Sequence, residues 1–312
     1  MDRLDMRILT ELMRDSRVSV TRLAKELGIS REVATYRMNK MRDDGVILNY
    51  VTEIDLAKLG YLGAAVFVNV KATGQTKFRK FLDDCPFVSW VAELSGIWSF
   101  GFSIYGKSPA DLDKKFLTII EAFKMDLIDN RFSLHRRSLF FYEKYFGAAP
   151  AKTMKKQLIR YDIDEKDRRI LKELALNSRI SSVALAEKVS LTAPAVAQRI
   201  NQLERSGFIT RYSIFVDITK LGLFQYSVFV INKNLDKKPG LLDYLRAHPA
   251  VPYIAEYVGD PFLEFGIAVK NPYELRTLLQ GIEEIFPDHR VIEVSLFHHE
   301  LASVGPPACV FE

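Results

Sequence analysis

Hydrophobic residues near the start of the chain follow the spacing of two short amphipathic helices with a break between them. Leu23 and Leu27 fall on one face of the first helix, and Ala34 and Met38 on one face of the second. Between them, Gly28-Ile29-Ser30 supplies a glycine suited to left-handed backbone and a serine suited to cap the next helix. The pattern predicts a helix-turn-helix.

Two further elements flank this motif. Residues 2–13 are predicted to form a helix, in which Leu4, Ile8 and Leu12 share the buried side and Asp2 lies near the free N–H groups of the first turn. Residues 46–52 are hydrophobic and strand-like, as expected for a short wing. The segment is therefore predicted to be a winged helix-turn-helix.

The pattern from Leu4 to Gly60 returns in the second half of the chain without a gap. About a third of the aligned residues are identical, which indicates an internal duplication of whole modules. The matches include Asp5 with Asp167, Ser16 with Ser178, Arg17 with Arg179, Arg37 with Arg199, Asn39 with Asn201, Gly45 with Gly207 and Tyr50 with Tyr212.

Each winged module is followed by strands and helices in the order βαββαβ, which predicts a ferredoxin-like sandwich. In the first copy we expect strands over residues 62–70, 88–94, 100–105 and 132–145, and helices over 76–84 and 109–123. In the second we expect strands over 224–231, 251–258, 262–269 and 291–299, and helices over 241–247 and 272–286. The predicted fold class is α+β, in two tandem copies.

These patterns divide the chain into five segments. We predict winged helix-turn-helix modules at residues 1–60 and 162–222, ferredoxin-like effector and oligomerisation modules at 61–146 and 223–312, and a linker at 147–161 that contains small residues, a proline and three lysines. One face of each small sheet needs a cover, so the two sandwiches are expected to pair either within one chain or between chains.

Composition and charge narrow the class of protein. The sequence is 48% hydrophobic and 27% charged, which is ordinary for a globular protein. The absence of a long apolar run, of a secretory signal pattern and of more than two cysteines predicts a cytoplasmic protein without a disulfide framework or zinc site. Residues 1–160 carry a net charge of roughly +8 and the remainder roughly −3, so the first half is the better candidate for binding a polyanion.

The arrangement resembles the leucine-responsive regulatory protein/AsnC family of bacterial and archaeal transcription regulators. The resemblance is carried by Leu23-Ala24-Lys25-Glu26-Leu27-Gly28-Ile29-Ser30 at the turn, by the run from Arg37 to Ile47, and by Leu185-Ala186 and Gly207-Phe208-Ile209 in the second copy. It implies DNA-binding modules followed by modules that bind a small effector and oligomerise. A usual family member has one copy, so this chain is expected to form a homodimer or higher oligomer, or to mimic a dimer within one polypeptide.

In a helix-turn-helix the second helix enters the major groove, and the side chains opposite its buried stripe meet the DNA. Cations and amides on that outer face suit phosphates and base edges respectively. The DNA-binding residues predicted on this basis are Arg31, Thr35, Tyr36, Arg37, Asn39 and Lys40 in the first copy, and Gln198, Arg199 and Gln202 in the second. Because Ala193 replaces Arg31 and Gln202 replaces Lys40, we expect the first copy to supply most of the affinity.

The family resemblance also implies an amino-acid pocket near a glycine followed by an acidic residue after the second strand of the sandwich. The second copy has Gly259 and Asp260 there, whereas the first has Gly96-Ile97-Trp98. Asp260 is therefore the candidate partner for an effector's ammonium group, or else a turn residue before Pro261. Trp98 is expected to make a buried contact with another module.

Two alternatives remain at this point. Siroheme decarboxylases resemble this architecture, so an enzyme acting on a tetrapyrrole is one, although the chain has only five histidines and lacks nucleophile-elbow, phosphate-loop and paired-histidine motifs. A metabolite sensor that does not bind DNA is the other. We expect a non-enzymatic DNA-binding regulator without a cofactor or a metal, which responds to an amino acid or related metabolite.

Overall fold

The computed structural model describes residues 1–150, 159–232, 238–301 and 305–312, which group into two compact units. The first unit contains residues 1–61, 159–217 and 305–312, and the second contains 62–150, 218–232 and 238–301. The sequence placed 305–312 in the second sandwich, whereas this segment, with the short helix Ala308–Val310, groups with the winged helices. The lysine-rich part of the predicted linker, 151–158, lies outside the described residues.

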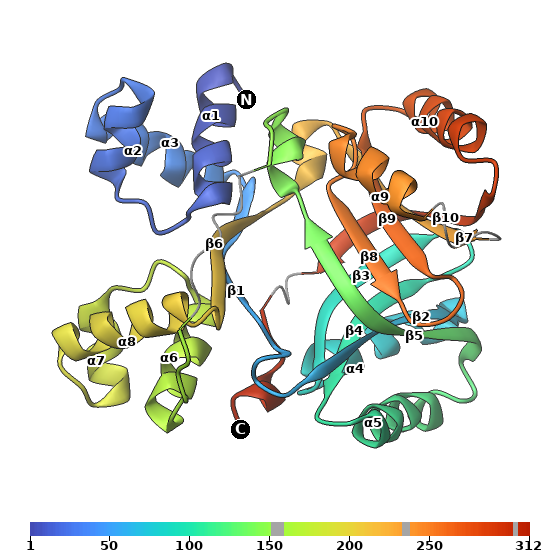
Figure 1. The fold of residues 1–312 in the computed structure, drawn as a ribbon, viewed down its shortest axis with the longest axis horizontal. Coiled ribbons are helices and arrows are strands. Elements are labelled where there is room, and N and C mark those ends of the chain that lie inside the picture. Colours follow the sequence, from blue (N-terminus) through green and yellow to red (C-terminus); the bar gives the residue numbers. More distant parts are fainter. Residues whose placement is uncertain (151–158, 233–237, 302–304) are drawn as a thin grey trace. The chain divides into compact units, whose positions relative to one another are not determined.

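The first unit contains both winged helix-turn-helix modules (Figure 1). The first module consists of α1 (Arg3–Arg14), α2 (Val20–Leu27), α3 (Arg31–Asp43) and β1 (Ile47–Ile54), and the second of α6 (Glu165–Leu176), α7 (Ser182–Val189), α8 (Ala193–Arg205) and β6 (Ile209–Val216). A serine or threonine hydroxyl caps the N-terminus of the second and third helices of each module: Ser19 and Ser30 in the first module, Ser181 and Thr192 in the second. Gly28 closes α2 in left-handed backbone with φ 71°, as the turn requires.

The two wings pair with each other, a partner that the sequence did not identify. Strands β1 and β6 run antiparallel, with Val51 opposite Ser213 and Thr52 opposite Tyr212. Helix α1 packs on β6 and helix α6 on β1, so each module is completed by a strand of the other copy. Hydrogen bonds fix this exchange: Ser213 Oγ donates to the carbonyl oxygen of Met13 at 3.0 Å, and Thr52 Oγ1 to that of Leu174 at 2.7 Å.

The second unit has the predicted βαββαβ order twice. The first copy consists of β2 (Leu62–Val70), α4 (Gln75–Asp84), β3 (Val88–Ser95), β4 (Phe100–Gly106), α5 (Pro109–Ala122) and β5 (Leu127–Phe140). The second consists of β7 (Phe224–Asn232), α9 (Lys238–Ala247), β8 (Tyr253–Tyr257), β9 (Leu263–Val269), α10 (Pro272–Ile285) and β10 (His289–Leu301). The last strand of the first copy begins earlier than predicted, at Leu127. It also ends earlier, at Phe140, because a 3₁₀ helix follows at Tyr142–Phe146.

The strands of both copies close into one barrel in the order β10-β3-β4-β2-β5-β8-β9-β7. The seams between copies are the antiparallel pairs β5–β8 and β10–β3, so the two sandwiches pair within the chain. Each copy has its own apolar core on the helix side of its sheet. A third cluster between the copies contains Phe67, Phe229 and Trp98, which confirms the buried contact predicted for Trp98.

Candidate nucleic-acid interface

Helix α3 presents a buried stripe and an opposite polar ridge. Ala34, Met38 and Met41 are buried against the rest of the module. The exposed side chains on the other side include five of the six predicted from the sequence: Arg31, Thr35, Tyr36, Asn39 and Lys40. Tyr36 is 66% exposed, so its ring is open to a partner. The helix therefore offers cations, an amide and an aromatic ring on one open face.

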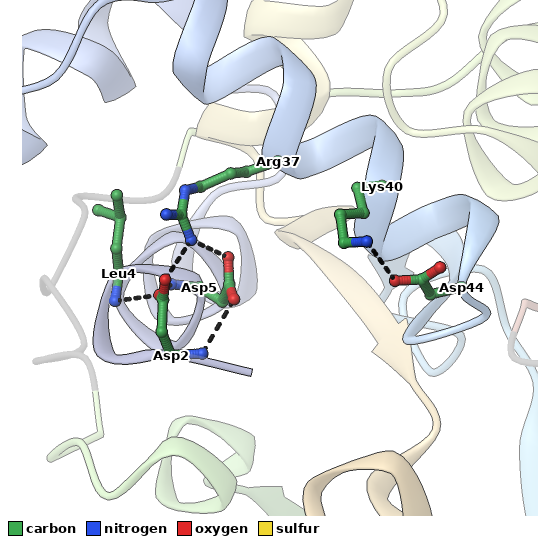
Figure 2. Close-up of polar contacts among 6 residues, drawn as sticks. All are labelled: Asp2, Leu4, Asp5, Arg37, Lys40 and Asp44. Atoms are coloured by element: carbon green, nitrogen blue, oxygen red, sulfur yellow. Dashed lines mark hydrogen bonds and ion pairs between the residues drawn. The ribbon is translucent and has the colours of Figure 1, made fainter.

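The polar groups on this ridge make only weak contacts with other residues of the protein. Lys40 Nζ lies 3.6 Å from Asp44 Oδ2, with both side chains more than half exposed (Figure 2). An exposed pair of this kind contributes about 0–1 kcal/mol, so a DNA phosphate can replace the carboxylate at little cost. Thr35 Oγ1 donates to the carbonyl oxygen of Arg31 at 2.8 Å, which leaves its methyl group and lone pairs for base edges.

Arg37 differs from its neighbours because it is engaged inside the module (Figure 2). Its Nη1 lies 2.6 Å from Asp2 Oδ2 and 2.7 Å from Asp5 Oδ1, and its side chain is 26% exposed. Asp2 and Asp5 form the capping box of α1. The Asp5 N–H and the Arg37 guanidinium lower the pKa of Asp2, and the two carboxylates raise the pKa of Arg37. Arg37 thus ties the recognition helix to the start of α1.

The second copy repeats this ion pair at the aligned positions. Arg199 Nη1 lies 2.9 Å from both Asp164 Oδ2 and Asp167 Oδ1, which form the capping box of α6. Burial would raise the pKa of Asp164, but the Asp167 N–H and Arg199 together hold it below its ordinary value. Sequence reasoning assigned Arg37 and Arg199 to phosphate contact and missed this second role. The signal was the retention of both aspartates in both copies.

Helix α8 presents a less cationic face than α3. Gln198 is exposed, whereas Gln202 and Arg199 are half-buried. The buried stripe consists of Val196, Ile200 and Leu203, so α8 packs in its module with the same face as α3. Its exposed ridge lacks the arginine and lysine that flank α3, because Ala193 and Gln202 occupy those positions. The two modules are therefore alike in fold and unlike in charge.

A buried junction relates the two modules by an approximate two-fold axis. Arg17 Nη1 donates to the carbonyl oxygens of Ser178 and Ile180 at 2.5 and 3.1 Å, and Arg179 Nη1 donates to those of Ser16 and Val18. Each guanidinium also lies over a tyrosine ring: Arg17 over Tyr212 at 5.3 Å and Arg179 over Tyr50 at 5.5 Å. This reciprocity fixes the two recognition helices as a pair.

The predicted effector residues lie in the second unit. Gly259 and Asp260 are exposed in the connection between β8 and β9, and Gly259 has φ 95°, a left-handed value that favours glycine. This geometry suits a turn, and the effector role stays a prediction. In the parts of the chain that the structure describes, no group of three or more histidine, cysteine or acidic side chains is placed to hold a metal ion. No helix there is long and apolar enough to cross a bilayer.

Comparisons with known proteins agree with this geometry. A family model described as winged helix-turn-helix DNA-binding matches residues 1–47 and 163–210, one match in each copy. The proline dehydrogenase transcriptional activator of Rhodobacter capsulatus is 36% identical over 94 residues, which are 30% of this chain and 61% of that protein. The HTH-type transcriptional regulator LrpB of Bacillus subtilis is 43% identical over 121 residues, 38% of this chain and 80% of that regulator.

Two further matches concern the length and fold of the whole chain. An uncharacterised HTH-type transcriptional regulator of Pyrococcus abyssi is 32% identical over 128 residues, 40% of this chain and 82% of that protein, so a relative of this kind corresponds to about half of the chain. The crystal structure of the siroheme decarboxylase NirDL is similar over 98% of this chain and 94% of its own, with a TM-score of 0.65 and 17% identity. At that identity the likeness concerns the fold.

Proposed function

The chain belongs to the leucine-responsive regulatory protein/AsnC family of transcription regulators, and we propose that it is itself a sequence-specific DNA-binding regulator that carries a pair of recognition modules on one polypeptide. The observation that supports this proposal most directly is the open polar ridge of α3, held in a fixed relation to α8 by the buried junction between the modules. A helix-turn-helix dimer binds two half-sites one helical turn apart, and one chain of this protein has both halves.

The two half-sites are expected to contribute unequally. The α3 ridge brings Arg31 and Lys40 toward phosphates, whereas α8 has Ala193 and Gln202 at the same positions. The module of α3 therefore supplies most of the electrostatic affinity, and that of α8 adds amide contacts through Gln198 and Gln202. An operator for this protein would consist of two dissimilar half-sites rather than a palindrome.

Genome-wide mapping of bound DNA, with and without added amino acids, identifies the operator. A gel shift on the recovered sites then tests the interface with two matched variants at aligned positions, Tyr36→Ala and Gln198→Ala. We expect Tyr36→Ala to weaken specific binding by about 1–3 kcal/mol and Gln198→Ala to weaken it less. Equal losses would remove the asymmetry, and binding that does not fall as salt rises would contradict a phosphate-driven interface.

The response to a small molecule is a second part of the proposal. Asp260 carries an exposed carboxylate beside Gly259, and a carboxylate is the chemistry needed to receive an ammonium group. Calorimetric titration of the full chain with a panel of amino acids tests this, with Asp260→Asn as the variant that keeps the shape and removes the charge. A titration heat that is the same in both proteins would rule out Asp260 as the binding group.

The fold match favours one other candidate, a tetrapyrrole enzyme like the siroheme decarboxylase that this chain resembles over 98% of its length. Among the histidines of the second unit, His135 packs against Tyr257, His248 against Tyr244, and His289 against Phe262 and Phe286. These rings contact different aromatic neighbours, so they do not form one cluster. Purified protein that shows a tetrapyrrole absorbance band, or that takes up an added iron porphyrin stoichiometrically, would favour this candidate over the regulator.

A further inference from the structure

The winged-helix unit contains a pocket of about 490 Å³ beside the recognition helix. It lies between α3, the beginning of β1 and the segment after α6. Apolar side chains of α2, α3, β1 and the end of α6 line part of it, and its polar lining consists of Thr35, Asn39, Arg42, Asn49, Tyr50, Asn177 and Arg179. Small-ligand pockets usually have volumes of about 300–1,000 Å³, and this pocket falls within that range.

The amide groups in the pocket are set to donate hydrogen bonds. Asn49 Oδ1 accepts the Tyr50 N–H at 2.8 Å, and Asn177 Oδ1 accepts the Arg179 N–H at 2.9 Å. These bonds fix which end of each amide faces the backbone, and they leave the Nδ2 donors for a ligand. Two donors of this kind in one pocket favour an acceptor such as a carboxylate or phosphate oxygen.

The charges in the pocket favour the same ligand chemistry. Its lining contains two arginines and no acidic residue. Arg179 contacts the carbonyl oxygens of Ser16 and Val18 and the Tyr50 ring, while Arg42 is 57% exposed and lies 3.5 Å from Asp43 Oδ1. Guanidinium groups bind carboxylate and phosphate oxygens through charge-assisted, often bidentate hydrogen bonds.

The second copy provides an internal comparison, because its aligned residues make a different arrangement. Glu204 replaces Arg42 and accepts a hydrogen bond from Tyr212 Oη at 2.8 Å. Arg211 replaces Asn49 and lies 2.6 Å from Glu53 Oε1, and Asp15 replaces Asn177. The aligned positions thus carry two carboxylates, of which Glu204 bonds to a side chain and Asp15 accepts from the Arg17 N–H at 2.9 Å. The pocket has Arg42, Asn49 and Asn177 at the three positions where the aligned residues are Glu204, Arg211 and Asp15.

We propose that this pocket binds a small organic anion, with a carboxylate or phosphate between Arg42 and Arg179 and an apolar body against α3 and β1. Thr35 and Asn39 line the pocket and also lie on the α3 ridge. A bound anion therefore opposes contact between that ridge and DNA phosphates. This linkage rests on the proposed function, whereas binding of the anion does not.

The test uses the full chain and the fluorescent anion 1-anilinonaphthalene-8-sulfonate, with adenosine monophosphate and inorganic phosphate as competitors. Arg42→Glu introduces the residue type that the second copy has at this position, and Arg7→Glu on the exposed side of α1 is the control of equal charge change. We expect Arg42→Glu to weaken probe binding about tenfold, Arg7→Glu to leave it unchanged, and adenosine monophosphate to displace the probe from the unmodified chain. Arg42 is exposed, so circular dichroism should show an unchanged fold.

Equal probe affinity in the unmodified chain and in Arg42→Glu would contradict anion binding in this pocket. Displacement of the probe by duplex DNA, but by neither adenosine monophosphate nor phosphate, also overturns the small ligand, because the anion is then a DNA phosphate. Probe binding that needs Arg42 while the chain binds no DNA supports the pocket and contradicts the regulator. The linkage is overturned if probe binding needs Arg42 but saturating adenosine monophosphate leaves the DNA affinity unchanged.

Discussion

The hydroxyl oxygens of Ser16 and Ser178 lie 2.6 Å apart in the interior of the winged-helix unit. The Ser16 N–H donates to the Tyr212 carbonyl at 3.1 Å, and the Ser178 N–H to the Tyr50 carbonyl at 3.0 Å. The two serines occupy aligned positions in the duplicated sequence, so their contact marks the axis that relates the modules. Together with the β1–β6 ladder, this junction sets the spacing of α3 and α8.

Truncating an arginine of the junction should loosen the unit. Arg17→Ala removes the donor to the carbonyls of Ser178 and Ile180 and should lower the free energy of unfolding by about 1–3 kcal/mol, because partly buried acceptors lose their partner. Denaturant titration measures this. The exposed Arg7→Ala should change it by less than about 0.5 kcal/mol. Indistinguishable stabilities would show that the β1–β6 pairing alone holds the modules together.

The salt dependence of DNA binding distinguishes a phosphate contact from a positioning residue. Lys40→Ala should reduce the slope of log K against log salt by about one, because one released counterion is lost. Arg37→Ala should weaken binding with a smaller change in slope, because Nη1 of that guanidinium already contacts Asp2 and Asp5. If Arg37→Ala reduces the slope as much as Lys40→Ala does, Arg37 contacts a phosphate directly.

Removing a negative charge from the recognition helix should strengthen binding. Glu32 is exposed in the first turn of α3, where a hydrogen bond from its own backbone N–H and one from Ser30 lower its pKa and keep it ionised. Glu32→Gln should raise DNA affinity a few fold at low salt and little at high salt, because the effect is electrostatic. Filter binding at two salt concentrations measures it. An unchanged affinity at low salt would place Glu32 away from the DNA.

Acid should destabilise the barrel through a buried histidine. Burial lowers the pKa of His135 from 6.5 to about 4, and its ring nitrogens have no hydrogen-bond partner within the described residues. The unfolded chain binds this proton below pH 6.5 and the folded chain only near pH 4, so stability is full above pH 6.5 and is lost as the pH falls toward 4.

The slope from this one group should approach about 1.4 kcal/mol per pH unit. His135→Phe keeps a ring beside Tyr257 and cannot titrate. The difference in unfolding free energy between the two proteins should therefore change with pH over this interval. A difference that is constant from pH 4 to pH 7 would mean that His135 is protonated equally in both states.

Sequence periodicity predicted the elements well and their partners poorly. The spacing of Ala34, Met38 and Met41 identified the buried side of α3, because helix geometry fixes which residues share a face. It could not identify the contact of Arg37 with Asp2 and Asp5, which depends on how α1 and α3 pack. The sequence also could not predict which strands pair between the copies, because pairing between distant segments leaves no local pattern. These pairs are β1–β6, β5–β8 and β10–β3.

The exchange of strands between the modules means that neither half of this polypeptide is self-sufficient. Without residues after 150, α1 would expose the apolar surface that β6 covers, β1 would lose its ladder, and the barrel would open along both seams. Two once-redundant copies have become mutually dependent parts. Differences between the copies, such as the fewer cations on α8, are compatible with this arrangement because each copy still supplies its strand to the other.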